Sequence, residues 1–378
     1  MSYLRLDEVC NLKMGQSPDS GSYNQERDGI PFFQGNADFG EMHPVTRTWC
    51  NNPTKVVDKG TLLISVRAPI GALNFAVEKS CIGRGLAGIT AKNEYDLKYI
   101  YYALKYKNRE LKDKGTGSTF KAISKSTLGK VLIRDMTIEN QRECIKRLDL
   151  IYKIFVTKKE KIRQYDELIK SWFVEMFGTL EKNQYKNDIV SFGDVCSMIK
   201  DGTHQTPIYT ENTKEGYKFL SSKDIMTQKI DWSNIKYIPA DLHEKLYAVI
   251  KPQRNDILMS KNGVNYGVAA INDTDEIFDI YVSLALLRPT EVINPVYFKC
   301  AINNPDIKRQ FDGSIKGIGV PNLHLKEIRK TRLLLPPRVL QDRFAAFVHQ
   351  VDKLRFETQK ALTETQQLFD SLMQKYFG

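Results

Sequence analysis

Glu139–Gly178 has the sequence ENQRECIKRLDLIYKIFVTKKEKIRQYDELIKSWFVEMFG, and Val339–Gly378 has the sequence VLQDRFAAFVHQVDKLRFETQKALTETQQLFDSLMQKYFG. The two stretches align over 40 residues without a gap, at an offset of 200. The identical pairs are Gln141/Gln341, Lys153/Lys353, Leu168/Leu368, Ser171/Ser371, Phe177/Phe377 and Gly178/Gly378. Neither stretch contains Pro, and Gly occurs only as the last residue, as at a helix C-terminus. The repeat predicts two matching long helices.

Both stretches carry a series of seam positions at alternating spacings of four and three residues, which is typical of a helix with one buried seam. In the first stretch the series is Cys144, Leu148, Ile151, Phe155, Ile162, Tyr165, Ile169, Trp172 and Met176, with Lys158 as a polar gap. In the second it is Phe344, Val348, Val351, Arg355, Thr358, Leu362, Thr365, Phe369, Leu372 and Tyr376. Such a seam needs a partner, either a globular unit or the other helix. The matched length and spacing favour an antiparallel coiled coil of the two helices.

The segments before each helix also correspond, although more loosely. Leu6–Cys10 resembles Phe192–Cys196, and Gly60–Ser65 resembles Asn255–Ser260. Further matched pairs are Gly29–Phe33 with Gly216–Leu220, the turns Arg67–Gly71 with Asn262–Gly267, the short apolar helices Leu97–Leu104 with Val296–Ile302, and the Gly-rich loops Lys114–Lys121 with Gly313–Gly319. Short β-rich runs separated by Gly and Pro predict mixed α+β modules. We expect the order module (1–138), helix (139–178), module (179–338) and helix (339–378).

The charge of the chain is distributed unevenly between these segments. The 378 residues include 56 basic and 45 acidic side chains, which gives a formal net charge of +11. Residues 1–138 have a net charge of +6 and residues 179–338 of +3, whereas 139–178 and 339–378 have net charges of +2 and zero. Basic modules joined to nearly neutral helices are expected if the modules contact nucleic acid and the helices contact protein.

The cysteines and the apolar runs indicate the compartment. Six cysteines are scattered without a CxxC pair, which predicts buried thiols in a reducing environment. The N-terminal residues lack a basic and then apolar signal pattern, and no apolar run reaches 18 residues. We expect a cytoplasmic protein with no membrane partner.

The sequence contains no recognised catalytic motif. Methylation of a base amino group requires an Asn/Asp-Pro-Pro-aromatic loop, but Asn51–Thr54 and Asn303–Asp306 lack the second Pro and the aromatic residue. Neither a Walker A sequence nor HExxH occurs. His204 lies three residues after Asp201, but no nucleophile motif accompanies the pair. We therefore expect a chain without catalytic activity, metal site or cofactor, in which His204 contacts DNA or stabilises a turn.

Essentially the whole chain resembles the specificity subunits of type I restriction–modification systems. Ile199–Tyr209 (IKDGTHQTPIY) resembles the opening motif of that family's target-recognition domains. Asp256–Ser260 with the following Asn262-Gly263 resembles the central strand-and-turn motif. The residues that resemble the entry into the conserved helix are Val320–Leu323, Leu333–Pro337 and Gln341. The first module departs from this pattern, since Leu132–Thr137 lacks the Pro-Pro pair and Asn11–Ser22 lacks Asp-Gly-Thr-His.

The resemblance implies a division of labour within the chain. Each target-recognition domain is implied to recognise one half of a split double-stranded DNA target, while the paired helices set the gap and dock two methyltransferase subunits. Restriction and translocase subunits are further implied partners. S-adenosylmethionine, ATP and Mg²⁺ are implied as cofactors of the partner subunits, with none on this chain.

Two other classes of function stay open at this point. One is a recognition subunit of a different methylase-linked system, which predicts DNA binding with other partners. The other is a coiled-coil scaffold whose modules bind protein or carbohydrate, which predicts no salt-sensitive DNA binding.

Candidate DNA contacts are polar and basic residues on segments predicted to be turns. Lys and Arg neutralise phosphates, whereas Arg, Asn, Gln and Ser contact base edges. In the first module the candidates are Gln16, Ser17, Gln34, Asn36, Arg67, Arg84, Ser118 and Lys121. In the second they are His204, Gln205, Ser222, Lys223, Lys261, Asn262, Tyr266 and Lys316. Arg67 and Lys261 are the strongest single candidates, because the corresponding turns place a basic group in both modules.

Overall fold

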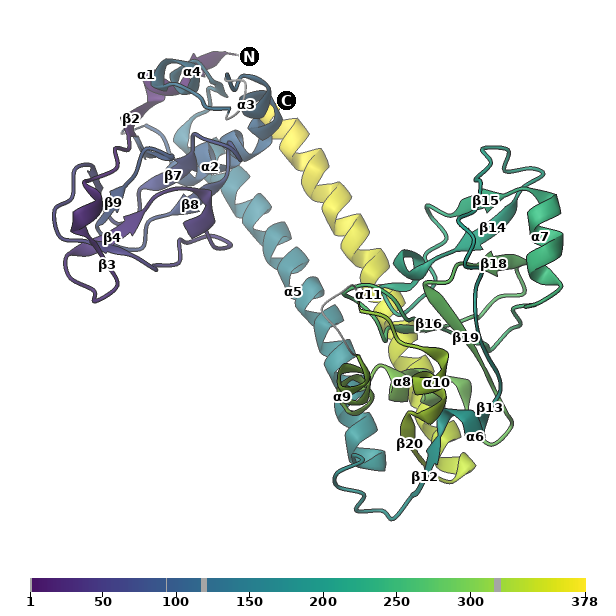
Figure 1. The fold of residues 1–378 in the computed structure, drawn as a ribbon. Coiled ribbons are helices and arrows are strands. Elements are labelled where there is room, and N and C mark those ends of the chain that lie inside the picture. Colours follow the sequence, from purple (N-terminus) through teal and green to yellow (C-terminus); the bar gives the residue numbers. More distant parts are fainter. Residues whose placement is uncertain (1, 93, 117–120, 316–320) are drawn as a thin grey trace. The chain divides into compact units, whose positions relative to one another are not determined.

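A computed structural model describes residues 2–92, 94–116, 121–315 and 321–378. The chain forms two compact units (Figure 1). The first unit consists of Met1–Lys159 together with Lys360–Gly378, and the second consists of Glu160–Gln359. Each unit therefore contains one module and one part of each long helix.

The first unit is built around three sheets. The central sheet is antiparallel with the strand order β2-β10-β7-β8, a mixed sheet has the order β3-β5-β4-β9-β6, and β1 pairs with β11. The strands are β1 (Tyr3–Arg5), β2 (Cys10–Met14), β3 (Tyr23–Asn24), β4 (Ile30–Phe33), β5 (Trp49–Cys50), β6 (Val56–Val57), β7 (Leu62–Ser65), β8 (Leu73–Phe75), β9 (Ser80–Ile82), β10 (Leu86–Ala91) and β11 (Leu132–Arg134). The helices before the long helix are α1 (Leu6–Val9), α2 (Leu97–Tyr106), α3 (Asn108–Asp113) and α4 (Lys125–Gly129).

The second unit repeats this plan. Its sheets have the strand orders β13-β19-β16-β17, β15-β14-β18 and β12-β20. The strands are β12 (Asp188–Ser191), β13 (Cys196–Asp201), β14 (Tyr217–Leu220), β15 (Lys236–Ile238), β16 (Ile257–Ser260), β17 (Ala269–Ile271), β18 (Phe278–Ile280), β19 (Leu284–Pro289) and β20 (Arg332–Leu335). The helices are α6 (Phe192–Val195), α7 (Ala240–Tyr247), α8 (Pro295–Ile302), α9 (Pro305–Ser314) and α10 (Leu325–Lys330).

The two modules share one hydrogen-bonded framework. β2-β10-β7-β8 corresponds to β13-β19-β16-β17, and the parallel pair β4–β9 corresponds to β14–β18. The turns after β7 and β16 are closed by the same bond, because Ser65 Oγ accepts the Ala72 N–H at 2.9 Å and Ser260 Oγ accepts the Val268 N–H at 3.0 Å. The predicted pair of similar α+β modules is confirmed.

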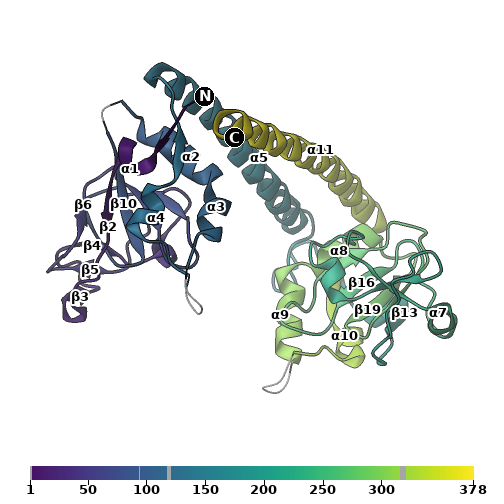
Figure 2. The ribbon, with the colours of Figure 1, turned by 90° about the horizontal axis from the view of Figure 1, so that it is seen from above.

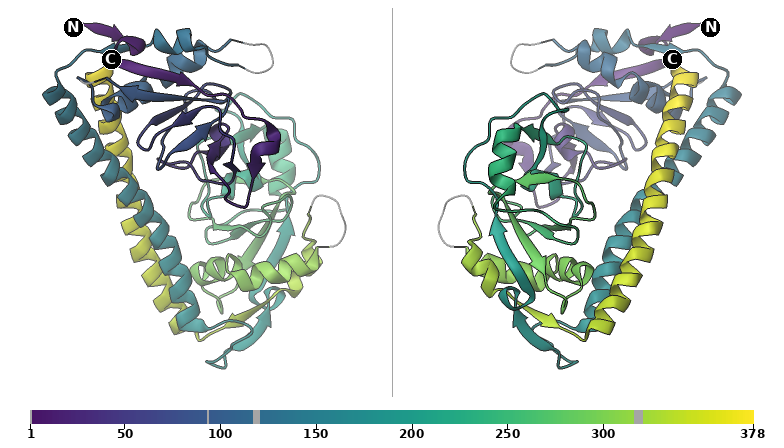
Figure 3. Two further views of the ribbon diagram at one scale, coloured as in Figure 1. Left: turned by 90° about the vertical axis from the view of Figure 1, so that its left-hand side faces the viewer. Right: turned by 90° about the vertical axis from the view of Figure 1, so that its right-hand side faces the viewer.

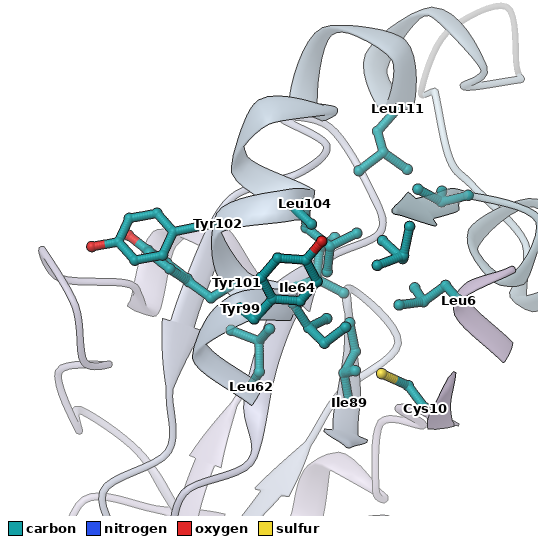
Figure 4. Packing of buried hydrophobic residues seen from close by; sticks show 14 of the residues in the cluster. Leu6, Cys10, Leu62, Ile64, Ile89, Tyr99, Tyr101, Tyr102, Leu104 and Leu111 are labelled. Atoms are coloured by element: carbon teal, nitrogen blue, oxygen red, sulfur yellow. The ribbon is translucent and has the colours of Figure 1, made fainter. Parts of the chain in front are cut away.

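The core of the first unit lies between α2 and its central sheet (Figure 4). Tyr99 and Leu104 on α2 pack with Leu62, Ile64 and Ile89 of the sheet, and all five side chains are fully buried. Burial of a side chain of this size contributes about 1.5–3 kcal/mol to the stability of the folded state. This packing fixes the strands relative to α2, and with them the loops at the strand ends.

The central sheet of the second unit contains β13, β19 and β16 (Figure 2). Buried clusters lie on both of its faces. Ile257 and Met259 of β16 belong to the cluster with Tyr297 of α8, whereas Leu258 belongs to the cluster with Phe278 of β18. This alternation is the period of two that a β-strand imposes on its side chains. The all-apolar run of β16 therefore serves two cores.

A buried glutamine attaches each long helix to its module. Gln141 and Gln341 are both 0% exposed. Gln141 accepts the Asp96 N–H at 2.9 Å, and its amide group donates to two main-chain carbonyls. Gln341 makes the equivalent bonds, beginning with the Asn294 N–H at 2.7 Å. The identity at this position of the repeat has a structural reason, because loss of either side chain leaves buried polar groups unpaired.

The long helices are α5 (Ile138–Phe177) and α11 (Arg338–Phe377), and parts of both lie side by side in each unit (Figure 3). In the first unit the Lys158 ammonium donates to the Ala361 carbonyl at 3.0 Å and to Thr365 Oγ1 at 3.1 Å. In the second unit Arg355 forms an ion pair with Asp166 at 3.0 Å. The predicted antiparallel pairing is confirmed within each unit, and the polar gaps of the seam are filled by bonds between the helices.

In the last turns of both helices the most deeply buried side chains lie one residue after the predicted seam positions 172, 176, 372 and 376, although the predicted residues still contact the cores or the other helix. Trp172 is 41% exposed, whereas its neighbour Phe173 is buried. Phe173 stacks on Tyr297 of α8 with ring centroids 5.3 Å apart, so this turn packs against the module as well as against α11. In α11 Met373 is buried in the same way, whereas Leu372 is half-buried. Packing on a module rotates the buried face by one residue.

The predicted Gly-rich loop Gly313–Gly319 is also partly wrong. Gly313 and Ser314 form the last residues of α9 rather than a loop. Ile315 follows the helix in extended backbone, and residues 316–319 lie outside the described part of the chain.

Candidate nucleic-acid interface

In the first module, loops from five places in the sequence meet where the strands end. Hydrogen bonds join them in a chain: the Gln16 N–H donates to the Ile82 carbonyl at 3.0 Å, Gly83 to Phe33 at 2.8 Å, Val66 to Gly85 at 2.9 Å, and Ala68 to Lys121 at 3.1 Å. We call residues 15–17, 34–36, 66–68, 83–85 and 121–123 the first loop cluster. The close approach requires glycine at position 85, since a Cβ there would lie 2.4 Å from the Gln34 carbonyl oxygen.

The first loop cluster contains most of the predicted first-module candidates. Gln16, Gln34, Arg67, Arg84 and Lys121 have exposed side chains, while Ser17 and Asn36 are half-buried. Ser17 Oγ accepts the Arg84 N–H at 3.3 Å, which ties these two candidates together. Ser118 lies outside the described residues. The structure thus brings seven of the eight candidates onto adjoining loops.

The second module has an equivalent arrangement. The Thr203 N–H donates to the Ile280 carbonyl at 3.1 Å, Ser222 to Ser283 Oγ at 3.0 Å, Lys261 to the Ser283 carbonyl at 2.9 Å, and Leu323 to the Lys261 carbonyl at 2.8 Å. We call residues 202–205, 221–223, 261–263, 281–283 and 321–323 the second loop cluster. It contains His204, Gln205, Ser222, Lys223, Lys261 and Asn262, whereas Lys316 lies outside the described residues.

Lys261 is placed differently from the exposed phosphate contact expected from the sequence. Its side chain is only 5% exposed, and its ammonium lies 2.9 Å from the Asp201 carboxylate. His204 approaches the same carboxylate oxygen at 3.3 Å with a side chain that is 75% exposed. The buried ion pair holds the end of β13 against the end of β16, and it leaves His204 as the surface member of the group.

The proposed equivalence of Arg67 and Lys261 is wrong by one residue. Val66 donates to Gly85 and accepts from Ile123, and Lys261 makes the same two bonds with Ser283 and Leu323. The counterpart of Lys261 is therefore Val66, which is 2% exposed. In extended backbone a shift of one residue moves the side chain to the opposite face. The match based on charge therefore paired the buried side chain of Lys261 with the exposed side chain of Arg67.

Tyr266 lies apart from the second loop cluster. Its hydroxyl donates to Asp312, and Lys308 lies over its ring at 3.9 Å from the centroid. Hydrogen bonds from Lys308 and Tyr266 lower the pKa of the Asp312 carboxyl. The group attaches the turn after β16 to α9.

Sequence reasoning missed two residues of the second loop cluster and its surroundings. Ser283 accepts from Ser222 through its hydroxyl and from Lys261 through its carbonyl, so it joins two loops. Val264 is 83% exposed in the turn after Asn262. An apolar residue within a polar Gly-containing turn is the signal that could have identified Val264.

The described residues offer little for catalysis. Burial raises the pKa of the Cys10, Cys144 and Cys196 thiols to about 12, which suppresses the nucleophilic thiolate. His243 Nδ1 lies 2.7 Å from Asp279, but both side chains are buried, where they connect α7 to β18. Within the described ranges no group of three His, Cys, Asp or Glu residues is arranged to hold a metal ion, and no helix is long and apolar enough to span a membrane.

The chain is similar to several proteins that are named as type I specificity subunits. Residues 1–164 match the family model of the type I restriction modification DNA specificity domain. The putative type I restriction enzyme MjaX specificity subunit of Methanocaldococcus jannaschii is 43% identical over 165 residues, which are 43% of this chain and 39% of that protein. The MjaIX specificity subunit of the same organism is 24% identical over 343 residues, 85% of this chain and 77% of that protein.

The crystal structure of the type I restriction–modification S subunit from M. genitalium has the same fold as the whole chain. It is 17% identical, the match covers 100% of this chain and 96% of that one, and the TM-score is 0.60. Residues 1–164 thus match the type I restriction modification DNA specificity domain, and the whole chain shares the fold of a type I S subunit. The first loop cluster lies within the segment that the family model matches, and the second loop cluster lies outside that segment.

Proposed function

We propose that this chain is a type I specificity subunit that recognises a bipartite double-stranded DNA target, one half through each loop cluster. The observation that carries the proposal is the occurrence of the same set of loops at the same strand ends in both modules, with different side chains on a common framework. Exposed Arg, Lys, Gln and His side chains on these loops fit phosphate and base-edge contacts. Exposed residues that vary on a constant scaffold are what two different half-sites require.

The proposal assigns the long helices to spacing and to the docking of two methyltransferase subunits. Three exposed apolar positions recur at the offset of 200: Ile154 with Leu354, Val156 with Phe356, and Leu168 with Leu368. Each unit contains one complete set, two residues from one long helix and one from the other. Two matched sets of apolar residues support two copies of one protein partner, since exposed apolar groups favour association.

In this proposal the chain itself performs no chemistry. Methylation, ATP-driven translocation and cleavage belong to methyltransferase and restriction subunits, which also bind S-adenosylmethionine, ATP and Mg²⁺. The complex is proposed to act on cytoplasmic DNA.

The test is methylome sequencing of a methylation-deficient host that carries this chain with its methyltransferase. A bipartite target is expected, and deletion of this chain should abolish it. Exchange of residues 1–138 for the equivalent module of a relative should change one half of the target and leave the other half intact. A change in both halves, or in neither, would contradict the assignment of one half-site to each module.

A further inference from the structure

Arg67 and Asn262 occupy the same position in the two modules. Arg67 forms an antiparallel bridge with Ala122, and Asn262 forms an antiparallel bridge with Asn322. Asn322 lies 200 residues after Ala122, which is the offset of the repeat. The residue after each makes the next bond of the same ladder: the Ala68 N–H donates to Lys121 at 3.1 Å, and the Gly263 N–H donates to Pro321 at 3.0 Å. The equivalence therefore rests on backbone bonds and not on residue type.

The side chains of Arg67 and Asn262 lie on the face of this segment that is turned away from the core of the module. The preceding residues, Val66 and Lys261, are buried, and successive side chains of extended backbone point to opposite faces. Arg67 is exposed and Asn262 is half-buried. Neighbouring loops of the same cluster flank each position, since Gly85 bonds Val66 and Ser283 bonds Lys261. The position thus lies in the middle of each loop cluster.

Both polar groups are available for a ligand. The Arg67 guanidinium belongs to an exposed side chain. The amide oxygen of Asn262 is buried and has no hydrogen-bond partner in the described part of the chain. A buried acceptor without a partner destabilises the free protein. Rotation of the amide toward a base edge relieves that cost, because the oxygen exchanges an unpaired environment for a donor.

We infer that this shared position recognises a different purine in each half of the target: guanine through Arg67 and adenine through Asn262. The inference rests on the DNA-recognition function proposed above. A guanidinium donates two hydrogen bonds to guanine O6 and N7 in the major groove. An asparagine amide accepts from adenine N6–H and donates to N7. The two modules therefore hold purine-specific side chains of opposite preference at one structural position.

The experiment exchanges the two side chains in the full chain, expressed with its methyltransferase in a methylation-deficient host, and determines the target by methylome sequencing. Asn262→Arg is expected to replace one adenine of the second half-site by guanine and to leave the first half-site unchanged. Arg67→Asn is expected to make the reciprocal change in the first half-site. Asn262→Ala should reduce discrimination at that one position by about 5- to 150-fold.

Two variants separate recognition from folding. Asn262→Gln retains the amide and should retain adenine, because glutamine pairs with the same edge. Asn234→Ala removes an exposed asparagine of the same module outside the second loop cluster and should leave the target unchanged. Thermal unfolding of each purified complex shows whether Asn262→Arg is folded, and Asn262→Ala remains decisive if it is not.

The outcomes distinguish the inference from the proposed function. An unchanged target in Asn262→Ala and Asn262→Arg overturns the inference, as does equal weakening at every position, which would identify a phosphate contact. A wild-type second half-site without adenine also overturns it. Methylation that persists at the same target after deletion of this chain overturns the proposed function itself.

Discussion

The two modules differ most informatively at a pair of positions behind their loop clusters. In the second module Lys261 and Asp201 form a buried ion pair, whereas the corresponding residues of the first module are Val66 and Met14, which belong to one apolar cluster. The correspondence follows from the bonds of the next residues, since Gly15 donates to Leu86 and Gly202 donates to Leu284. One framework therefore tolerates either an apolar or an ionic contact at this junction. The two loop frameworks are the same in their backbone hydrogen bonds, although the side chains at this junction differ.

Breaking the ion pair should have the largest effect on stability. Lys261→Ala removes the ammonium that lies 2.9 Å from the mostly buried Asp201 carboxylate, which the exposed His204 side chain also approaches at 3.3 Å. We expect the free energy of unfolding to fall by about 3 kcal/mol. This value is at the lower end of the range for a broken buried ion pair, because Asp201 retains some exposure. Urea denaturation of the wild-type and variant chains measures the change.

The double variant Lys261→Val with Asp201→Met gives the second module the contact of the first. It should recover most of the lost stability, because an apolar pair of similar volume often replaces a buried ion pair without net loss. A double variant as unstable as Lys261→Ala would show that the two modules do not share this junction.

The next largest effect on stability is expected at the two buried glutamines, where the modules have equivalent hydrogen bonds. Gln141→Ala and Gln341→Ala each leave buried backbone groups without partners, and each should cost about 1–3 kcal/mol. Similar losses for the two variants, measured by thermal unfolding, are expected from their equivalent bonds. Gln367→Ala, at an exposed glutamine on α11, serves as the control and should change stability little. A loss in one module alone would contradict the equivalence.

Arg67→Ala probes the outward position beside Val66. If Arg67 contacts a guanine, discrimination at one position of the first half-site should fall by about 1–3 kcal/mol, with the other positions unchanged. The readout is the methylated target of the variant beside its parent. Uniform weakening over all positions would instead identify a phosphate contact.

The smallest expected change is in the gap between the two half-sites, and it tests the two long helices, which have matching lengths. Insertion of four residues after both Lys159 and Gln359 adds roughly 6 Å of helix and close to one full turn, so the seam stays nearly aligned. At about 3.4 Å per base pair, the gap between the half-sites should grow by one or two base pairs.

Both half-sites should keep their sequence in this variant, as determined by methylome sequencing. Insertion of two residues at the same places rotates the seam by roughly half a turn and should abolish activity. An unchanged gap with full activity after the four-residue insertion would show that the helices do not set the spacing.

The sequence predicted the helices and the duplicated α+β plan because periodicity and offset are local signals. Residue pairing within the loop clusters was predicted less well. The turns Arg67–Gly71 and Asn262–Gly267 differ in length by one residue, so charge suggested a match between Arg67 and Lys261 that the backbone bonds of Val66 and Lys261 exclude. The burial of Lys261 depends on Asp201, 60 residues away, and no local pattern reports such a contact. The burial of Trp172 was predicted wrongly for the same reason, because Phe173 packs on Tyr297, which is distant in the sequence.

The division of the chain into units has a consequence for its synthesis. Unit two is a continuous segment, whereas the core of unit one includes Phe369, Met373 and Phe377 from the far end of α11. A ribosome therefore completes Glu160–Gln359 before it supplies the residues that cover Cys144 and Leu148 of the first unit. Until then the N-terminal module exposes apolar surface, and its closure depends on contacts of very large sequence separation, which form slowly. The module that emerges first is the one that finishes folding second, and for that interval it depends on protection from aggregation.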